Sequence, residues 1–401
     1  MSDRSDITGS LRILHIGKYF PPHPGGMETY LRDLMNVQKR QGLEVMALVH
    51  TSKRGSFDIE ESVDALDGTT YQVMRSARWF NLSFVPISPG FIWSAFKAIK
   101  NFKPDLIHIH HPNSSAMWLL LLPAARRLPW VAHWHSDIVT PQSDFAVRLA
   151  YRIYEAWERR LLIRSRTIIA TSPPYLAKSP VLTAHRERCI CIPLGLDELR
   201  IPNPESVLEH ARPLAPLVLF VGRLVGYKGL ENLLMAMPYL EGVHCWIAGD
   251  GYLHGDIAEH IIANKLQDRV KLLGAVSEVQ KWQLFRTCDA VVLPSNQSNE
   301  AFGLVLLEAY LFNKPVVVTS ALGSGMSWVA GKIRGSAIAA PNDPLSLANA
   351  ISTVLAQLNK PTGTFTRHSE KTLSLSHQSQ QILAVYSETL RSDLWRNAED
   401  G

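Results

Sequence analysis

The sequence predicts an α/β protein built from two doubly wound halves, each a parallel sheet with helices packed on it. Short apolar runs, typical of buried strands, alternate with segments whose apolar residues recur at helical spacing. The alternation stops near residue 200 and starts again near residue 217. The chain has 401 residues, which is long enough for two domains of ordinary size.

In the first half, residues 11–17 predict a buried strand, and residues 27–42 predict a helix that Gly42 ends. Another clear helical pattern covers residues 145–164. Further strands of this half are expected at residues 43–50, 105–111, 129–135, 166–172 and 188–195. Strands that alternate with helices in this way favour a parallel sheet.

The second half repeats the pattern. Its strands are expected at residues 217–222, 243–249, 269–274, 289–295 and 314–320. The Pro-containing stretch 200–216 is the natural linker. We therefore divide the chain into an N-terminal domain over residues 1–200, a second domain over 201–375, and a final helix in 376–401 that we expect to pack back on the first domain. Two such domains bind ligands at the carboxyl ends of their strands, so we expect the site in a cleft between them.

Composition restricts the class of partner. The net charge is +5 and diffuse, which favours anionic substrates or an anionic membrane surface over nucleic acid. The four cysteines are too sparse for a disulfide scaffold. The N-terminus lacks a signal-peptide pattern, and the most apolar run, residues 117–125, is about half as long as a membrane span. We expect a cytoplasmic protein that is soluble or peripheral at the membrane.

The pair Gly25–Gly26 lies between the first predicted strand and the first predicted helix. Two glycines let backbone approach a ligand closely, and the helix N-terminus beyond them offers free N–H groups to an anion. An ordinary glycine-containing turn is the commoner explanation. The spacing does not match the glycine pattern of a dinucleotide-binding fold.

Two cations follow the first strand of the second half. Arg223 and Lys228 lie in a loop that also contains Gly222, Gly226 and Gly229. Positive charge at the end of a strand and before a helix suits a diphosphate. The alternative is a pair of solvated surface charges, the usual state of Lys and Arg.

Two carboxylates flank an apolar helical run. Glu300 precedes a helix predicted to begin near Gly303, and the N–H groups of Phe302, Gly303 and Leu304 would point at an anion there. Glu308 lies inside the helix among apolar neighbours. A buried carboxylate needs a partner, which is either a sugar diol of a ligand or a cation of the protein core. The residues alone favour neither.

Five histidines end two predicted strands; they are His108, His110, His111, His133 and His135. Strand alternation places His108 with His110 on one face, and His133 with His135. No carboxylate or thiolate set at ligand spacing accompanies them, so we expect hydrogen-bonded histidines and no metal site.

The segment 75–103 mixes basic and aromatic residues in a helix-like stretch. Such a composition suits a segment that lies at a membrane interface. A core helix with solvated lysines is the alternative, and we favour it slightly.

Several stretches resemble, in order, motifs of the retaining glycosyltransferases of family 4, which have the GT-B fold. They are PGGMETY at residue 24, HWHSD at 133, VGRLVGYKG at 221, IAGDG at 247 and SNEAFGLVLLEA at 298. The last resembles the family's E-x7-E motif through Glu300 and Glu308. The resemblance covers about residues 11 to 350, and the stretch 323–331 resembles mannosyl- and rhamnosyl-transferases that build bacterial polysaccharides.

This resemblance implies a role for each matching residue. Glu300 would hold hydroxyls of the donor sugar, and Glu308 the nucleotide ribose. Arg223 and Lys228 would bind the diphosphate and stabilise the departing nucleotide. His135 would touch the sugar near the reacting bond.

The resemblance further implies that Gly25–Gly26 closes over the donor phosphates or the acceptor, and that the reaction needs no metal and no cofactor. Two departures are visible. The family's Gly-His pair is Gly42-Leu43 here, and the stretch 331–340 lacks the acid that the family usually has after its motif.

We therefore expect a retaining enzyme that moves a hexose, mannose or rhamnose from a GDP-sugar, to a glycan or lipid-linked acceptor of cell-surface polysaccharide or lipopolysaccharide. Use of a UDP-sugar remains open. A nucleotide-sugar epimerase or hydrolase of the same fold and a non-catalytic sugar-nucleotide-binding subunit also remain open.

Overall fold

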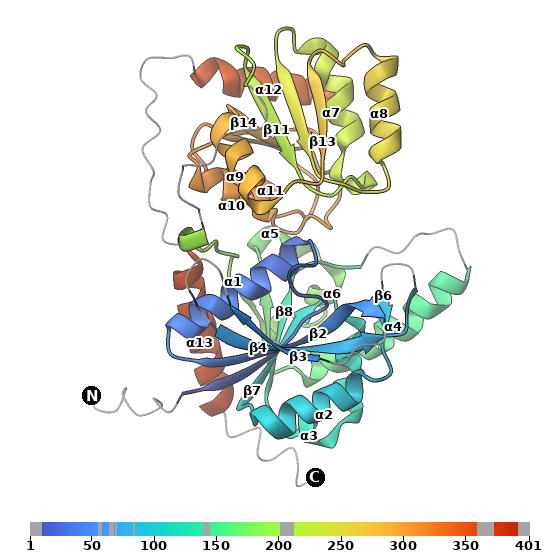
Figure 1. The fold of residues 1–401 in the computed structure, drawn as a ribbon, viewed down its shortest axis with the longest axis vertical. Coiled ribbons are helices and arrows are strands. Elements are labelled where there is room, and N and C mark those ends of the chain that lie inside the picture. Colours follow the sequence, from blue (N-terminus) through green and yellow to red (C-terminus); the bar gives the residue numbers. More distant parts are fainter. Residues whose placement is uncertain are drawn as a thin grey trace. The chain divides into compact units, whose positions relative to one another are not determined.

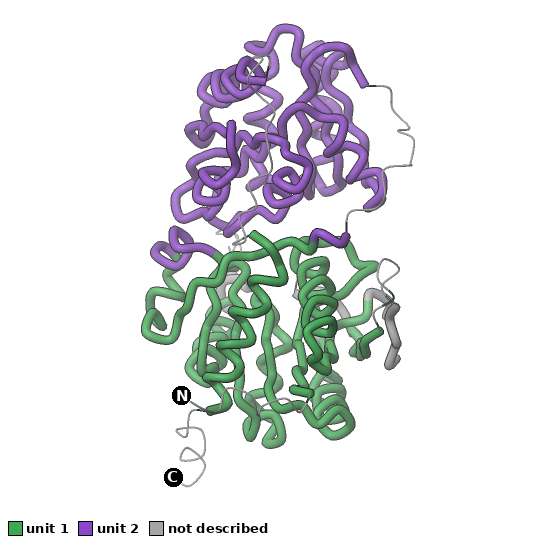
Figure 2. The backbone as a smooth tube through the Cα atoms, turned by 90° about the vertical axis from the view of Figure 1, so that its left-hand side faces the viewer, with its two compact units in different colours: residues 1–171, 179–197, 372–401 green, residues 172–178, 198–371 purple. Residues whose placement is uncertain are grey.

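The computed structural model describes residues 10–54, 58–63, 68, 70–82, 85–138, 145–200, 212–358 and 373–391. The chain forms two compact units (Figure 2). Unit 1 comprises residues 1–171, 179–197 and 372–401, and unit 2 comprises residues 172–178 and 198–371. In the described part, no helix is long and apolar enough to cross a membrane.

Unit 1 is built on an eight-stranded sheet with the order β10-β9-β8-β7-β1-β2-β4-β3 (Figure 1). Its strands are β1 (Arg12–Ile16), β2 (Glu44–Arg54), β3 (Asp58–Val63), β4 (Thr70–Arg78), β7 (Leu106–His111), β8 (Trp130–Trp134), β9 (Thr167–Ala170) and β10 (Cys189–Cys191). Every neighbouring pair is parallel except β3 with β4. A separate antiparallel ribbon joins β5 (Phe80–Leu82) and β6 (Val85–Ile87).

The helices of unit 1 are α1 (Gly26–Arg40), α2 (Phe91–Phe102), α3 (Pro123–Arg126), α4 (Phe145–Arg164), α6 (Pro180–Thr183) and α13 (Leu375–Arg391), with 3-10 turns η1 (Ser114–Leu121) and η2 (Arg186–Arg188). The expected helices over 27–42 and 145–164 are confirmed by α1 and α4. The final helix α13 begins before residue 376 and lies in unit 1.

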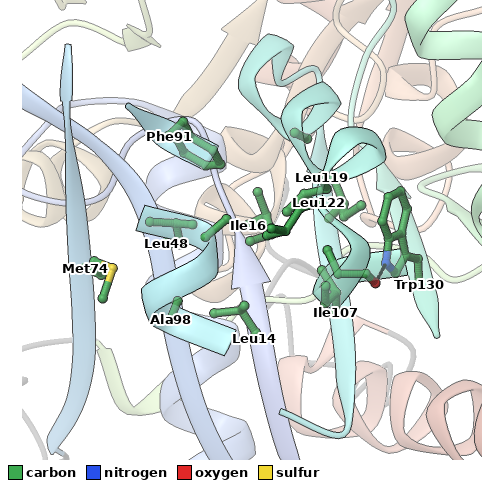
Figure 3. Packing of buried hydrophobic residues seen from close by; sticks show 14 of the residues in the cluster. Leu14, Ile16, Leu48, Met74, Phe91, Ala98, Ile107, Leu119, Leu122 and Trp130 are labelled. Atoms are coloured by element: carbon green, nitrogen blue, oxygen red, sulfur yellow. Dashed lines mark hydrogen bonds between the residues drawn. The ribbon is translucent and has the colours of Figure 1, made fainter. Parts of the chain in front are cut away.

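The two faces of this sheet differ in chemistry. On one face, apolar side chains such as Leu14, Ile16 and Ile107 pack against α2, η1 and α3 (Figure 3). On the other face, strand alternation brings histidines of β1, β7 and β8 under α1 and α13. The sequence therefore separates an apolar core layer from a layer of buried polar rings.

The helix-like interpretation of residues 75–103 is wrong for its first part. Among the described residues of this stretch, only Phe91–Phe102 is helical, whereas Arg75 and Arg78 lie on β4. The Arg75 guanidinium donates a hydrogen bond to the Pro21 carbonyl at 2.7 Å, so it is tied to unit 1. The strand forms because β-pairing with β2 and β3 satisfies its backbone.

Unit 2 contains a six-stranded, fully parallel sheet with the order β13-β12-β11-β14-β15-β16. Its strands are β11 (Leu217–Val221), β12 (His244–Ala248), β13 (Val270–Gly274), β14 (Ala290–Leu293), β15 (Val316–Thr319) and β16 (Ala337–Ala339). Counted along the chain, the order is third, second, first, fourth, fifth and sixth, which is the Rossmann order. Strand order therefore reverses between β11 and β14, where such sheets bind ligands.

The helices of unit 2 are α5 (Pro173–Lys178), α7 (Leu230–Ala236), α8 (His254–Ala263), α9 (Glu278–Thr287), α10 (Leu304–Leu311), α11 (Met326–Ala330) and α12 (Pro344–Leu358), with 3-10 turns η3 (Glu198–Arg200), η4 (Gly226–Lys228) and η5 (Met237–Tyr239). Both units are thus Rossmann-like, as predicted. Most of the proposed linker, residues 201–211, lies outside the described residues. The expected cleft between the units stays a prediction.

Candidate active site

An ion pair marks the point where strand order reverses in unit 2. Lys228 follows β11 in the turn η4, and Glu300 follows β14. The Lys228 ammonium donates a hydrogen bond to the Glu300 carboxylate, and the two side chains are only 10% and 13% exposed. Removing two charges from water is costly, so this pair is weak evidence for stability. Its position at the carboxyl ends of the strands fits a ligand site better.

A glycine lets the loops that carry this pair touch. Gly229 has a φ of 67°, in the left-handed region. A Cβ atom there would lie 2.1 Å from the Pro294 carbonyl oxygen, so no side chain fits. Backbone contact between the loops after β11 and β14 therefore brings Lys228 within reach of Glu300.

The segment 323–331 braces the backbone at Glu300. The Ser324 hydroxyl donates to the Glu300 carbonyl at 2.5 Å, and the Gly325 N–H donates to the Ala301 carbonyl at 3.0 Å. A Cβ atom on Gly325 would lie 2.3 Å from that same Ala301 oxygen. The sequence identified this segment only through its resemblance, and its bracing role was missed.

Arg223 supplies a second cation to the same loop. Its side chain is exposed, and its guanidinium donates to the Tyr227 hydroxyl at 3.1 Å. The Tyr252 hydroxyl accepts a hydrogen bond from the Gly226 N–H at 3.0 Å, which ties the loop after β12 to this one. The exposed fork of Arg223 can bind an anionic oxygen without breaking an ion pair.

The helix α10 begins where the sequence predicts. Gly303 caps it with a φ of 79°, and Leu304 is its first residue. Phe302 is buried beneath the turn. The first N–H groups of a helix have no partner within it, so those of Phe302, Gly303 and Leu304 are suited to an anion beside Glu300.

Glu308 has a protein partner. Its carboxylate accepts a hydrogen bond from the Lys281 ammonium at 2.6 Å, and Lys281 also contacts Glu278 at 2.9 Å. Burial alone would lower the pKa of Lys281, but Glu308 and Glu278 more than offset it and raise the pKa above its ordinary value. Glu308 thus forms a buried ion pair with Lys281 of α9. Of the two partners that the sequence left open, the protein supplies the cation.

Gly25 caps the helix α1, in unit 1. A Cβ atom on Gly25 would lie 2.1 Å from a carboxylate oxygen of Glu28, in the first turn of that helix. The absence of a side chain on Gly25 thus leaves room for the Glu28 carboxylate. The ligand roles of Gly25 and Gly26 stay predictions.

The histidines of unit 1 form a layer on the sheet face covered by α1 and α13. The layer comprises His15, His108, His110, His133 and His135. The sequence analysis missed His15, which pairs in register with His108. His111, at the end of β7, lies outside this layer, and its ring packs on Trp134. Burial lowers the pKa of His15 to about 4 and that of His135 to about 3. For His108, His110 and His133, burial and then the neighbouring rings lower the pKa well below its ordinary value.

Ring orientation argues against a metal in this layer. Nitrogens of two trios lie within 4.8 Å of one another, namely those of His15, His108 and His110 and those of His110, His133 and His135. Each trio, however, contains two rings stacked face to face. The centroids of His108 and His110 are 4.5 Å apart, and those of His133 and His135 are 4.4 Å apart. An imidazole binds metal through a lone pair in its own ring plane, so two stacked rings do not point at one ion.

Two Rossmann-like units, one with a charged site at its switch point, are the architecture of GT-B enzymes. Residues 25–195 match the family described as "Glycosyl transferase 4-like domain", and residues 210–363 match "Glycosyl transferases group 1". The chain belongs to the family 4 glycosyltransferases.

Two relatives are similar over most of the chain. The O-antigen chain mannosyltransferase C of Escherichia coli is 30% identical over 85% of this chain and 88% of its own length. The D-rhamnosyltransferase WbpZ of Pseudomonas aeruginosa is 31% identical over 85% of this chain and 86% of its own length. The chain is therefore a glycosyltransferase.

Solved structures share the fold. Sucrose-phosphate synthase from Thermosynechococcus elongatus aligns with a TM-score of 0.72 and 21% identity over 94% of this chain and 98% of that one. Alr3699/HepE of Anabaena, solved in complex with UDP-glucose, aligns with a TM-score of 0.69 and 21% identity over 94% and 100%. These likenesses confirm the GT-B fold.

Proposed function

We propose that the protein is a retaining hexosyltransferase that moves mannose or rhamnose from a GDP-sugar to a glycan or lipid-linked acceptor in cell-surface polysaccharide or lipopolysaccharide synthesis. The buried ion pair of Lys228 and Glu300 at the switch point of unit 2 is the observation that carries the proposal. The names of the two similar relatives support the sugar and the O-antigen context. The cytoplasm is the proposed compartment.

The charges divide the work in this proposal. Arg223 and Lys228 neutralise the diphosphate as negative charge develops on the leaving nucleotide. The N–H groups at the start of α10 add partial positive charge beside them. Glu300, at which the backbone is held by the hydrogen bonds from Ser324 and Gly325, accepts hydrogen bonds from donor-sugar hydroxyls. Until a sugar arrives, the Glu300 carboxylate accepts its hydrogen bond from the Lys228 ammonium.

A donor screen tests the proposal. Nucleoside diphosphate sugars with guanine or uracil bases are compared by thermal shift, and the best donor is then incubated with candidate acceptors. We expect a GDP-hexose to give the largest shift and an α-configured product from an α-configured donor. Sugar release or epimerisation without acceptor would favour the hydrolase or epimerase, and binding without any turnover would favour the non-catalytic subunit.

Turnover is expected to persist in excess EDTA. The proposal assigns charge neutralisation to Arg223, Lys228 and helix-end N–H groups, so no metal is needed. The measurement is the initial rate of nucleotide release before and after dialysis against EDTA. Loss of turnover that zinc or manganese restores would contradict the metal-independent proposal.

Glu308 is the proposed ribose ligand, and its replacement by glutamine should weaken binding of donor and free nucleoside diphosphate by roughly 1.5–3 kcal/mol, as for a charged hydrogen bond. Because the variant also deprives the buried Lys281 of one carboxylate, we expect a lower melting temperature as well.

The variant Glu278→Gln is the matched control. Glu278 is the other carboxylate on Lys281 but is half exposed. Because Glu278 also pairs with the buried Arg200, we expect this variant to lose stability too, but to keep its nucleotide affinity. If Glu308→Gln melts earlier yet binds nucleotide as the wild type does, Glu308 serves the fold alone.

The outer face of α2 is proposed as a peripheral membrane contact. Trp93 is 68% exposed and Phe96 is 40% exposed, and Lys97 and Lys100 lie on the same open side. Trp79 adds a ring that is 60% exposed. Exposed aromatic rings beside lysines suit an anionic lipid surface.

Flotation with anionic liposomes checks this contact. We expect salt-sensitive binding by the wild type, and loss of binding when Lys97 and Lys100 are both changed to glutamate. Changing Lys265 and Lys271, exposed in unit 2, to glutamate alters the net charge equally and should leave binding intact. Equal flotation by both double variants would remove α2 as the contact.

A further inference from the structure

Buried side chains connect His135 to the interior of unit 1 through an unbroken hydrogen-bond chain. Nε2 of His135 lies 3.0 Å from Nδ1 of His110, and Nε2 of His110 lies 3.1 Å from Nδ1 of His15. Nε2 of His15 lies 2.8 Å from the amide oxygen of Gln38, on α1. The rings of His110 and His135 are 14° from parallel with centroids 5.3 Å apart, so they meet edge to edge. This geometry is that of N–H···N hydrogen bonds in the ring planes.

The amide of Gln38 sets the direction of every bond in the chain. Its nitrogen donates to the Tyr386 hydroxyl at 3.1 Å, which leaves its oxygen as the acceptor for His15. A neutral imidazole carries one proton, so donation from Nε2 of His15 makes its Nδ1 an acceptor. His110 then donates through Nε2 and accepts through Nδ1, and His135 donates through Nε2. Reversing the amide would reverse all of these roles.

His135 is the open end of the chain. Its side chain is only half buried, and its Nδ1 has no hydrogen-bond partner in the described part of the chain. With the proton held on Nε2, this Nδ1 presents a lone pair.

We propose that His15, His110 and Gln38 are positioning residues that lock His135 in one neutral tautomer, with Nδ1 as the acceptor for a substrate hydroxyl. The inference rests on the proposed function, and on the contact with the sugar near the reacting bond that the family resemblance implies for His135. Because the proton is fixed on Nε2, the Nδ1 atom of His135 is always unprotonated and can accept a hydrogen bond from the hydroxyl.

A proton relay along the same chain is the competing mechanism, and the surroundings disfavour it. A relay would leave an imidazolium at His110 or His15, but both rings are fully buried, and burial lowers both pKa values. The chain also ends at an amide, which is a poor proton acceptor. No buried carboxylate bonds to any ring of the chain within the described residues, so nothing there would stabilise the charge.

The test reads the tautomer directly. Protein labelled with ¹⁵N-histidine is examined by two-bond ¹H–¹⁵N correlation spectra, with His135→Gln used to assign the signal. We expect His135 to show a protonated Nε2 and an unprotonated Nδ1. The opposite tautomer, or exchange between the two, would overturn the proposal whatever the enzymatic activity is. A shift of these signals on adding Zn²⁺ would show a metal site instead.

Two matched glutamine variants connect the tautomer to catalysis. Gln38→Met removes the acceptor for His15, whereas Gln41→Met changes a glutamine of the same region that bonds α13 but no histidine. We expect Gln38→Met to let His135 exchange between tautomers in the spectrum, with unchanged affinity for nucleoside diphosphate. The loss in kcat should be about tenfold, less than the roughly 10²–10⁴-fold contribution of a general acid or base, because His135 itself stays in place. Gln41→Met should alter none of these.

A released tautomer with unchanged kcat would overturn the catalytic use of the lock. If the wild type shows no transfer at all but retains the locked tautomer, the proposed function fails and the lock stands.

Discussion

Replacing Lys228 with alanine is expected to lower kcat on the order of 10²-fold or more, comparable to the loss of one oxyanion donor. Lys228 neutralises charge that develops only as the nucleotide leaves, so the loss falls on turnover more than on ground-state binding. Arg223→Ala should cost a similar factor, although its exposed position makes it the milder change. The measurement is steady-state kinetics with the best donor.

The ion pair supplies an internal control for this prediction. Glu300→Gln should also lower kcat strongly while nucleoside diphosphate still binds. Because Lys228 and Glu300 contact each other, the double variant Lys228→Ala/Glu300→Gln should lose much less than the product of the two single losses. Full activity in Lys228→Ala would exclude the ion pair from catalysis.

Unit 1 is expected to unfold in mild acid. The five histidines of its buried layer have lowered pKa values, chiefly through burial, so they stay neutral in the folded state. The unfolded chain takes up a proton on each below about pH 6.5, so stability is full above that pH and is lost as the pH falls. At pH 5 this amounts to about 2 kcal/mol for His15, whose folded-state pKa is about 4, and the other rings act in the same direction.

One buried acid works in the opposite direction. Burial raises the pKa of Glu158 to about 7, so its neutral form favours the folded state as the pH falls. A single group offsets only part of the histidine effect. We therefore expect the melting temperature of unit 1 to fall steeply between about pH 6 and pH 5.

Circular dichroism melts from pH 8 to pH 5 measure this effect. His133→Leu removes one titrating ring whose nitrogens have no hydrogen-bond partner in the described residues, and it should lessen the acid sensitivity. His254→Gln, at an exposed position of α8, should not change it. A melting temperature that stays level down to pH 5 would contradict the neutral histidine layer.

The sequence predicts best what depends on local pattern. The strand Leu217–Val221 and the start of α10 after Gly303 follow from apolar runs and glycine chemistry. The contact between Lys228 and Glu300 was not predicted, although both lie in the loops that follow neighbouring parallel strands.

Strands with mixed polarity were missed. The edge strand Asp58–Val63 contains three acids and pairs antiparallel with β4, so it has no apolar run to reveal it. The end of its neighbour β4, from Arg75 to Arg78, was placed in a helix-like stretch, because it too has no apolar run. Pairing with adjacent strands, which no local window contains, decides their structure.

Partners that come from distant elements were also missed. Glu308 meets Lys281 through the packing of α10 beside α9, and 27 residues separate them. The histidine layer is completed by Tyr386, 278 residues beyond His108. Sequence periodicity places such a residue on one face of its helix or strand. It does not show which other helix or strand packs against that face.

Titration calorimetry with guanosine, GMP and GDP tests the site most directly, with the uridine series in parallel. If Arg223, Lys228 and the start of α10 hold a donor diphosphate, affinity rises with each phosphate, and Arg223→Ala loses most of the gain between the monophosphate and the diphosphate. Equal affinity across either series, or a gain that survives in Arg223→Ala, would contradict the assignment of the diphosphate to the switch point of unit 2.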